Sequence, residues 1–206
     1  MGTFPVIPPI LMSITMKTEC LTGLLLGAVA LSLPACASTP QEKNFQLNSQ
    51  DISPLRMMAN KQEYNSFGCN GSNVSPAISW TGAPPGTKSF ALMVYDPNAP
   101  TGSGFWQWQM INIPASETSL KEGAGDVNRK VAPKGAVQMR NDYGFYGYGG
   151  PCPPQGSVHL YEFVLHALDV DKVSVPKDAS GALTGYVVNA HTIDTATITA
   201  PFARGL

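Results

Sequence analysis

The chain has 206 residues, of which 43% are hydrophobic and only 13% are charged, and its formal net charge is −1. This composition excludes a wholly disordered chain, and the lack of excess positive charge argues against nucleic-acid binding through bulk electrostatics. The 20 Gly and 18 Pro residues interrupt the sequence too often for a bundle of long helices. We therefore expect short strands joined by many turns.

The sequence of the N-terminal segment is typical of an export signal. Residues 21–33 (LTGLLLGAVALSL) are uncharged and largely apolar, but a membrane-spanning helix needs about 20 such residues. The run has the length of a signal-peptide core and ends in Leu33-Pro34-Ala35-Cys36, which resembles a bacterial lipobox. We expect residues 1–36 to be a signal peptide, with Met16 as an alternative start, and Cys36 to carry a lipid anchor. Ordinary secretory cleavage at Ala35-Cys36-Ala37, which would give a soluble periplasmic or secreted protein, and an uncleaved anchor remain open.

The rest of the chain predicts a polar tether over residues 37–48 and one domain over residues 49–206. The domain alternates short apolar or alternating runs with Gly/Pro-rich loops, which predicts a mainly antiparallel β fold. Residues 179–190 carry an apolar stripe at helical spacing and predict one short helix. The expected strands are 51–58, 78–80, 89–95, 105–113, 136–139, 159–170 and 195–200.

Two cysteines, Cys69 and Cys152, remain after the export segment. In an exported protein such a leftover pair predicts a disulfide. Two other interpretations stay open: both thiols are free and buried, or Cys152 is a nucleophile with His159 as its base. The three histidines and the cysteines lack the spacing of a metal site, so we expect no metal and no cofactor.

Three polar residues stand at the ends of the two strongest predicted strands. His159 and Tyr161 are two positions apart and so share one strand face, beside the Gly/Pro-rich loop 140–156. Asp96 ends the predicted strand 89–95. If these strands are sheet neighbours, the three side chains meet at one end of the sheet. The alternative is a purely structural histidine and a turn-forming aspartate.

Four separated motifs resemble a known family. They are Phe67-Gly68-Cys69-Asn70-Gly71, Ser75-Pro76-Ala77-Ile78-Ser79-Trp80, the loop 96–104 (DPNAPTGSG), and Gly149-Gly150-Pro151-Cys152-Pro153-Pro154 followed by His159-Leu160-Tyr161. In this order and spacing they are similar to the phosphatidylethanolamine-binding protein family, in particular its bacterial Raf-kinase-inhibitor-like branch, from about Phe45 to Arg204. The resemblance implies a large antiparallel sheet packed on a smaller one, with one or two short peripheral helices.

The resemblance also implies a small surface cavity that accepts anionic groups. The positions that match the family's cavity are Asp96, Asn98, Gln107, Gly150, Pro151, His159 and Tyr161. Asp96 would orient His159, and since the site is at the surface we expect loss of His159 to cost little stability. Asn98 and Gln107 stand where the family usually has Asp and His, so the cavity should be more neutral than is usual. We also expect a cis peptide bond at Asp96-Pro97 or Ala99-Pro100.

Together these features predict an exported, non-catalytic binding or regulatory module of the bacterial cell envelope. Its partners would be a small anionic or polar ligand and, through Cys36, a membrane, with a homodimer suggested by related bacterial proteins. One alternative is an inhibitor of an exported enzyme. Another is a hydrolase, although no Gly-x-Ser-x-Gly motif occurs and Ser103 is the only serine in a suggestive setting.

Overall fold

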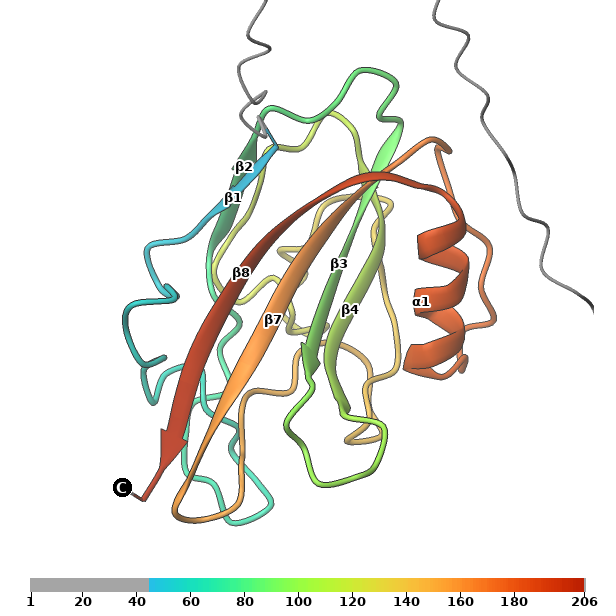
Figure 1. The fold of residues 1–206 in the computed structure, drawn as a ribbon. Helices are drawn as coiled ribbons and strands as arrows, with labels where there is room; N and C mark the ends of the chain where they lie inside the picture. The colour runs from blue at the N-terminus through green and yellow to red at the C-terminus, as the bar shows by residue number, and fades with distance from the viewer. Residues whose placement is uncertain (1–44, 206) are drawn as a thin grey trace, which may run out of the picture. The chain divides into compact units, whose positions relative to one another are not determined.

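A computed structural model describes residues 45–205 as two antiparallel β-sheets and one α-helix (Figure 1). The large sheet has the strand order β6-β4-β3-β7-β8, and the small sheet has the order β1-β2-β5. The strands are β1 (Gln46–Asn48), β2 (Ile78–Thr81), β3 (Ser89–Asp96), β4 (Phe105–Pro114), β5 (Ser119–Leu120), β6 (Val137–Gln138), β7 (Ser157–Leu168) and β8 (Thr192–Arg204). The predicted signal peptide, Met16, Cys36 and most of the predicted tether lie outside the described residues.

The centre of the large sheet is β3, which explains its sequence. Its run SFALMVYD is buried at nearly every position because both of its faces are covered. It pairs antiparallel with β4 on one side and with β7 on the other. The ends of these pairings bring Asp96 opposite Phe105 and Tyr95 opposite Glu162. The C-terminal end of β3 therefore lies beside the start of β4 and the first half of β7.

Each face of the large sheet has its own apolar core. On one face, side chains such as Leu92, Trp108 and Phe163 pack against Ile78 and Trp80 of the small sheet. On the other face the helix α1 (Gly181–Ala190) covers a smaller cluster, on the opposite side of the large sheet from β1 and β2 in Figure 1. Ser180 caps this helix, its hydroxyl accepting a hydrogen bond from the Leu183 N–H.

The predicted helix and most predicted strands are confirmed, with ends that differ by at most four residues, and the mainly β fold class is confirmed. The first predicted strand, residues 51–58, is wrong: this segment holds only an isolated bridge between Ser53 and Arg56. Pro54 lacks a donor there, and the Asp51 carboxylate is occupied by the Ala77 N–H and Lys61. The first strand of residues 45–205 is instead β1, which falls inside the segment expected to be a tether.

The peptide bonds of the loop after β3 also differ from expectation. Residues 45–205 contain no cis peptide bond, so the prediction for Asp96-Pro97 or Ala99-Pro100 is wrong. Paired prolines in a tight loop do not require the cis form, because trans is the preferred state of most X–Pro bonds. In the same part of the chain, no helix has the length and apolar character needed to cross a bilayer.

Candidate functional site

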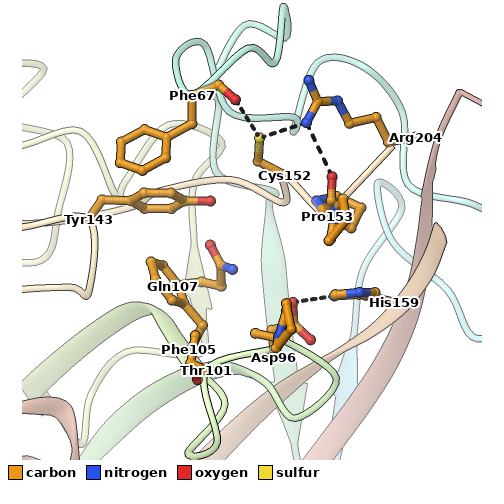
Figure 2. Close-up of a pocket in the computed structure, with 13 residues that line it drawn as sticks. Phe67, Asp96, Thr101, Phe105, Gln107, Tyr143, Cys152, Pro153, His159 and Arg204 are labelled. Carbon is orange, nitrogen blue, oxygen red and sulfur yellow. Dashed lines mark hydrogen bonds and ion pairs between the residues drawn. The ribbon is translucent and has the colours of Figure 1, made fainter. Parts of the chain in front are cut away.

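A surface cavity of about 270 Å³ lies where the described chain brings together the end of β3 and the starts of β4 and β7. Figure 2 shows its lining side chains, with Asp96, His159 and Gln107 below and Phe67, Tyr143 and Arg204 around the upper rim. Three of the predicted site residues, Asp96, Gln107 and His159, line it. The other lining residues are Phe67, Ala99, Pro100, Thr101, Phe105, Tyr143, Cys152, Pro153, Pro154 and Arg204.

The Asp96–His159 pair forms one side of the cavity. His159 Nδ1 lies 2.8 Å from Asp96 Oδ2, and the two side chains are only 8% and 4% exposed. The second carboxylate oxygen of Asp96 accepts the N–H of Asn98 at 2.9 Å. With Nδ1 bound to the carboxylate, His159 Nε2 has no hydrogen-bond partner among the described residues, and it can serve a ligand.

The expectation that loss of His159 costs little stability rested on an exposed position, and this premise is wrong, because His159 is only 6% exposed. The ring packs 6.4 Å from the ring of Tyr161, centroid to centroid, and is held between that residue and Asp96. Removing the imidazole would leave a buried carboxylate without its partner, which is a costly change.

Gln107 joins the floor of the cavity to the Gly/Pro-rich loop. With its amide oriented to satisfy the surrounding groups, the side-chain nitrogen donates to the carbonyl oxygens of Gly149 at 2.6 Å and Gly150 at 3.0 Å. The Tyr143 hydroxyl donates to the same Gly150 carbonyl at 3.0 Å. Burial raises the pKa of Tyr143, and the neighbouring Tyr64 raises it further, so the hydroxyl stays a neutral donor.

Three predicted site residues, Asn98, Gly150 and Pro151, support the cavity without lining it. Asn98 accepts the N–H of Leu160 at 2.8 Å and so fastens the loop after β3 to β7. Gly150 and Pro151 belong to the Gly/Pro-rich loop but do not line the cavity. The Gly150 N–H donates to the Asn73 side chain, and the Pro151 carbonyl accepts the N–H of Tyr64. A Cβ on Gly150 would approach the carbonyl oxygen of Gln62 to 1.9 Å, so only glycine fits there.

Tyr161 lies beneath the cavity and is 1% exposed. Its hydroxyl has no hydrogen-bond partner in the structure, which is unusual for a buried phenol. Burial raises the pKa of Tyr161, and the charge of Asp96 raises it further. Tyr161 is therefore a neutral buried donor behind His159.

The predicted disulfide is present. Cys69 and Cys152 are bonded, with their Cα atoms 5.9 Å apart, and they are 83 positions apart in the chain. The bond joins the 67–71 loop to the Gly/Pro-rich loop, and Cys152 itself lines the cavity. Across residues 45–205, no group of three or more His, Cys, Asp or Glu side chains is placed to hold a metal ion.

Sequence reasoning missed the aromatic and basic part of the lining. Phe67 is 71% exposed at the rim, and Phe105 and Tyr143 pack edge to face with their centroids 4.7 Å apart. Phe67 belongs to the motif 67–71. Its place next to Gly68 in a loop is the one sequence signal that could have indicated a residue at the cavity rim. No local signal marks Arg204, because it reaches the cavity only through the pairing of β8 with β7.

Comparison with known proteins identifies the family of this chain. The sequence matches the phosphatidylethanolamine-binding protein family over residues 48–203, and the chain belongs to this family. It is similar to the UPF0098 protein YbcL of Escherichia coli, with 48% identity over 77% of this chain and 87% of that protein. It is also similar to the UPF0098 protein YbhB of the same organism, with 41% identity over 77% of this chain and all of that protein.

Two solved structures and one further protein are also similar to this chain. The crystal structure of E. coli YbcL, described as a member of the mammalian PEBP family, aligns with a TM-score of 0.76 and 47% identity over 78% of this chain and 98% of that one. The homologue CT736 of Chlamydia trachomatis aligns with a TM-score of 0.66 and 30% identity over 79% of this chain and 99% of that one. A Mycobacterium tuberculosis protein named "Putative lipoprotein LppC" is 35% identical over 56% of this chain and 53% of that protein.

Proposed function

We propose that this protein is a non-catalytic binding module of the bacterial cell envelope whose cavity takes a small anionic or polar ligand. The observation that carries the proposal is the convergence of hydrogen-bond donors on one cavity. The Arg204 guanidinium and the His159 ring both line it, whereas the hydroxyls of Tyr143 and Thr101 donate to the Gly150 and Gly104 carbonyls and can only accept from a ligand. Arginine and histidine are suited to bind phosphate or carboxylate groups.

The one carboxylate in the lining does not oppose this use. One oxygen of the Asp96 carboxylate is hydrogen-bonded to the His159 ring, and the other accepts the Asn98 N–H. The aromatic side chains of Phe67, Phe105 and Tyr143 supply an apolar wall next to the donors. A ligand with a small anionic end and a short apolar part would use both sides of the cavity.

The cellular location is also a proposal. The name of the mycobacterial relative and the lipobox-like sequence before Cys36 both support a lipid-anchored envelope protein. Residues 37–44 separate Cys36 from Phe45, so a chain anchored at Cys36 has a reach of at most about 30 Å before the fold begins.

This reach bears on where the ligand comes from. Phe45 stacks on Phe90, with the ring centroids 6.1 Å apart, and Phe90 lies six positions before Asp96 on β3. The anchored end of the domain is therefore about 20 Å from the cavity along the strand. The reach of the tether exceeds this separation, so a headgroup in the bilayer and a ligand dissolved in the aqueous phase are both accessible to the cavity.

Titration calorimetry tests the proposed function. The purified protein is titrated with inorganic phosphate, with phosphorylethanolamine and with ethanolamine, which lacks the anion. We expect saturable binding of the first two and none of the third. Binding of ethanolamine with equal affinity, or of none of the three, would contradict an anion site.

Two further measurements address the alternatives. Ser103 lies outside the cavity lining, so under this proposal we expect no turnover of esterase or protease substrates. Native mass spectrometry of protein purified from its own envelope would detect a retained ligand and a homodimer. Co-purification of a stoichiometric exported enzyme in that preparation would favour the inhibitor hypothesis instead.

A further inference from the structure

Arg204 enters the cavity from the last residue of β8. Its Nη1 donates to the carbonyl oxygen of Pro153 at 3.3 Å and lies 3.8 Å from Cys152 Sγ, while Nη2 donates to the carbonyl oxygen of Gly68. Figure 2 shows this side chain on the opposite side of the cavity from Asp96 and His159. The guanidinium is therefore fixed by two backbone carbonyls from two different loops.

Both of these carbonyls belong to chain neighbours of the disulfide. Gly68 directly precedes Cys69, and Pro153 directly follows Cys152. The disulfide thus holds at a set spacing the two loops that hold Arg204. The contact with the first loop is close, because a Cβ on Gly68 would lie 3.0 Å from Arg204 Nη2, and Gly68 has a left-handed φ of +78°.

No carboxylate among residues 45–205 pairs with the positive charge of Arg204. Among residues 45–205, its partners are carbonyl oxygens and one disulfide sulfur. Guanidinium keeps its charge at every pH at which proteins fold. His159, in contrast, is already bound to Asp96. Arg204 is therefore the permanent cation of the cavity.

Resting on the proposed anion-binding function, we propose that Arg204 determines the anion affinity of this cavity and that the Cys69–Cys152 disulfide acts on binding through Arg204. The bond keeps the Gly68 and Pro153 carbonyls where they orient the guanidinium toward the ligand. Arg204 then supplies the charge that Gln107, a neutral amide, does not. A purely structural clamp would stabilise the loops and leave the anion affinity unchanged.

The first test compares arginine variants by calorimetric titration with inorganic phosphate. Arg204→Gln removes the charge, Arg204→Lys keeps the charge but loses the planar fork, and Arg56→Gln is the matched control. Arg56 also donates to a backbone carbonyl, that of Gln50 at 2.7 Å, and it lies outside the cavity. We expect affinity to fall at least about tenfold in Arg204→Gln, by an intermediate factor in Arg204→Lys, and not at all in Arg56→Gln.

The second test is a double-mutant cycle between Arg204 and the disulfide. We expect Cys69→Ser/Cys152→Ser to weaken phosphate binding in the unmodified protein but to have little further effect in the Arg204→Gln background. If the serine variant does not fold, Gly68→Ala takes its place, because it displaces the guanidinium while the disulfide stays intact. Circular dichroism checks the fold of each variant.

The outcomes separate this inference from the function on which it rests. If the unmodified protein does not bind phosphate, both fail. If it binds and Arg204→Gln binds equally well, or Arg56→Gln loses as much, Arg204 does not determine the affinity. If the disulfide or Gly68 variant loses the same factor in both backgrounds, the loops act on the ligand independently of Arg204.

Discussion

The Asp96 carboxylate and the His159 ring come from positions 63 apart in the chain, and their Oδ2 and Nδ1 atoms lie 2.8 Å apart. The antiparallel pairing of β3 with β7 produces this proximity, because Tyr95 is opposite Glu162, and Asp96, which follows Tyr95, therefore lies beside the residues that precede Glu162 on β7. Both side chains are nearly covered, so water cannot readily replace the hydrogen bond between them.

This relationship predicts a large stability cost for removing the ring. His159→Ala should lower the free energy of unfolding by about 2–4 kcal/mol, since the buried carboxylate is left unpaired. The control is His191→Ala, whose ring also pairs with a carboxylate, that of Asp169 at 3.1 Å, but is 39% exposed. Its loss should cost less than about 1 kcal/mol. Equal midpoints in urea for the two variants would contradict the assigned burial of the Asp96–His159 pair.

The disulfide should stabilise the fold strongly. A bridge that closes a loop of 83 positions contributes up to about 4–5 kcal/mol on the chain-entropy account. We therefore expect Cys69→Ser/Cys152→Ser to lower the unfolding free energy by several kcal/mol, measured by urea unfolding without reductant. A reducing agent should lower the stability of the unmodified protein and leave that of the serine variant unchanged. Unchanged stability of both would show that the bond adds nothing to the fold.

Changing Gln107 to histidine should strengthen anion binding at low pH. The introduced imidazole would stand in the cavity floor and become charged below a pH of about 6.5. We expect Gln107→His to bind phosphate about tenfold more tightly at pH 5.5 and with unchanged affinity at pH 8. The exposed Gln50, outside the cavity, gives the control variant Gln50→His. The same gain in the control would mean that general charge, not the cavity, causes the effect.

A buried histidine away from the cavity predicts a pH-dependent stability. Burial lowers the pKa of His166 from 6.5 to about 4, and its Nδ1 lies 3.0 Å from the Thr192 hydroxyl oxygen. Between pH 6.5 and 4 the unfolded chain takes up a proton that the folded protein rejects, so stability falls as the pH falls. This contribution is about 3 kcal/mol and is complete near pH 4.

Replacing His166 by a neutral side chain isolates this effect. His166→Gln should flatten the fall in unfolding free energy between pH 6.5 and pH 4, measured by urea unfolding at several pH values. The amide of the introduced side chain can still bond to Thr192. An identical pH dependence in the variant and the unmodified protein would show that His166 is not the residue responsible.

The sequence was most informative where periodicity and motifs were local. The alternation in residues 105–113 and the apolar run 89–95 predicted β4 and β3 closely, and export context predicted the disulfide. The β1 strand was missed because three residues are too few to show a period, and its partner β2 lies about 30 positions further along the chain. Such short edge pairings are set by tertiary contacts.

The cavity residues likewise include some that the sequence predicts and some that it does not. Asp96, Gln107 and His159 lie in or beside recognisable motifs, and the sequence predicted that they would meet. Arg204 could not be predicted, because its place depends on the register of β8 against β7 and on two loops joined by the disulfide. The burial of His159 was also missed, since a residue at the end of a strand gives no sequence signal for how the loops cover it.

The most direct test of the proposed anion cavity is a phosphate titration followed through the ring signals of the three histidines by nuclear magnetic resonance. Of these, only His159 lines the cavity, while His166 lies in β7 away from it and His191 is bound to Asp169 at the surface. We predict a saturable shift of the His159 signals and little change at the other two. No shift at His159, or an equal shift at His191, would contradict an anion site in this cavity.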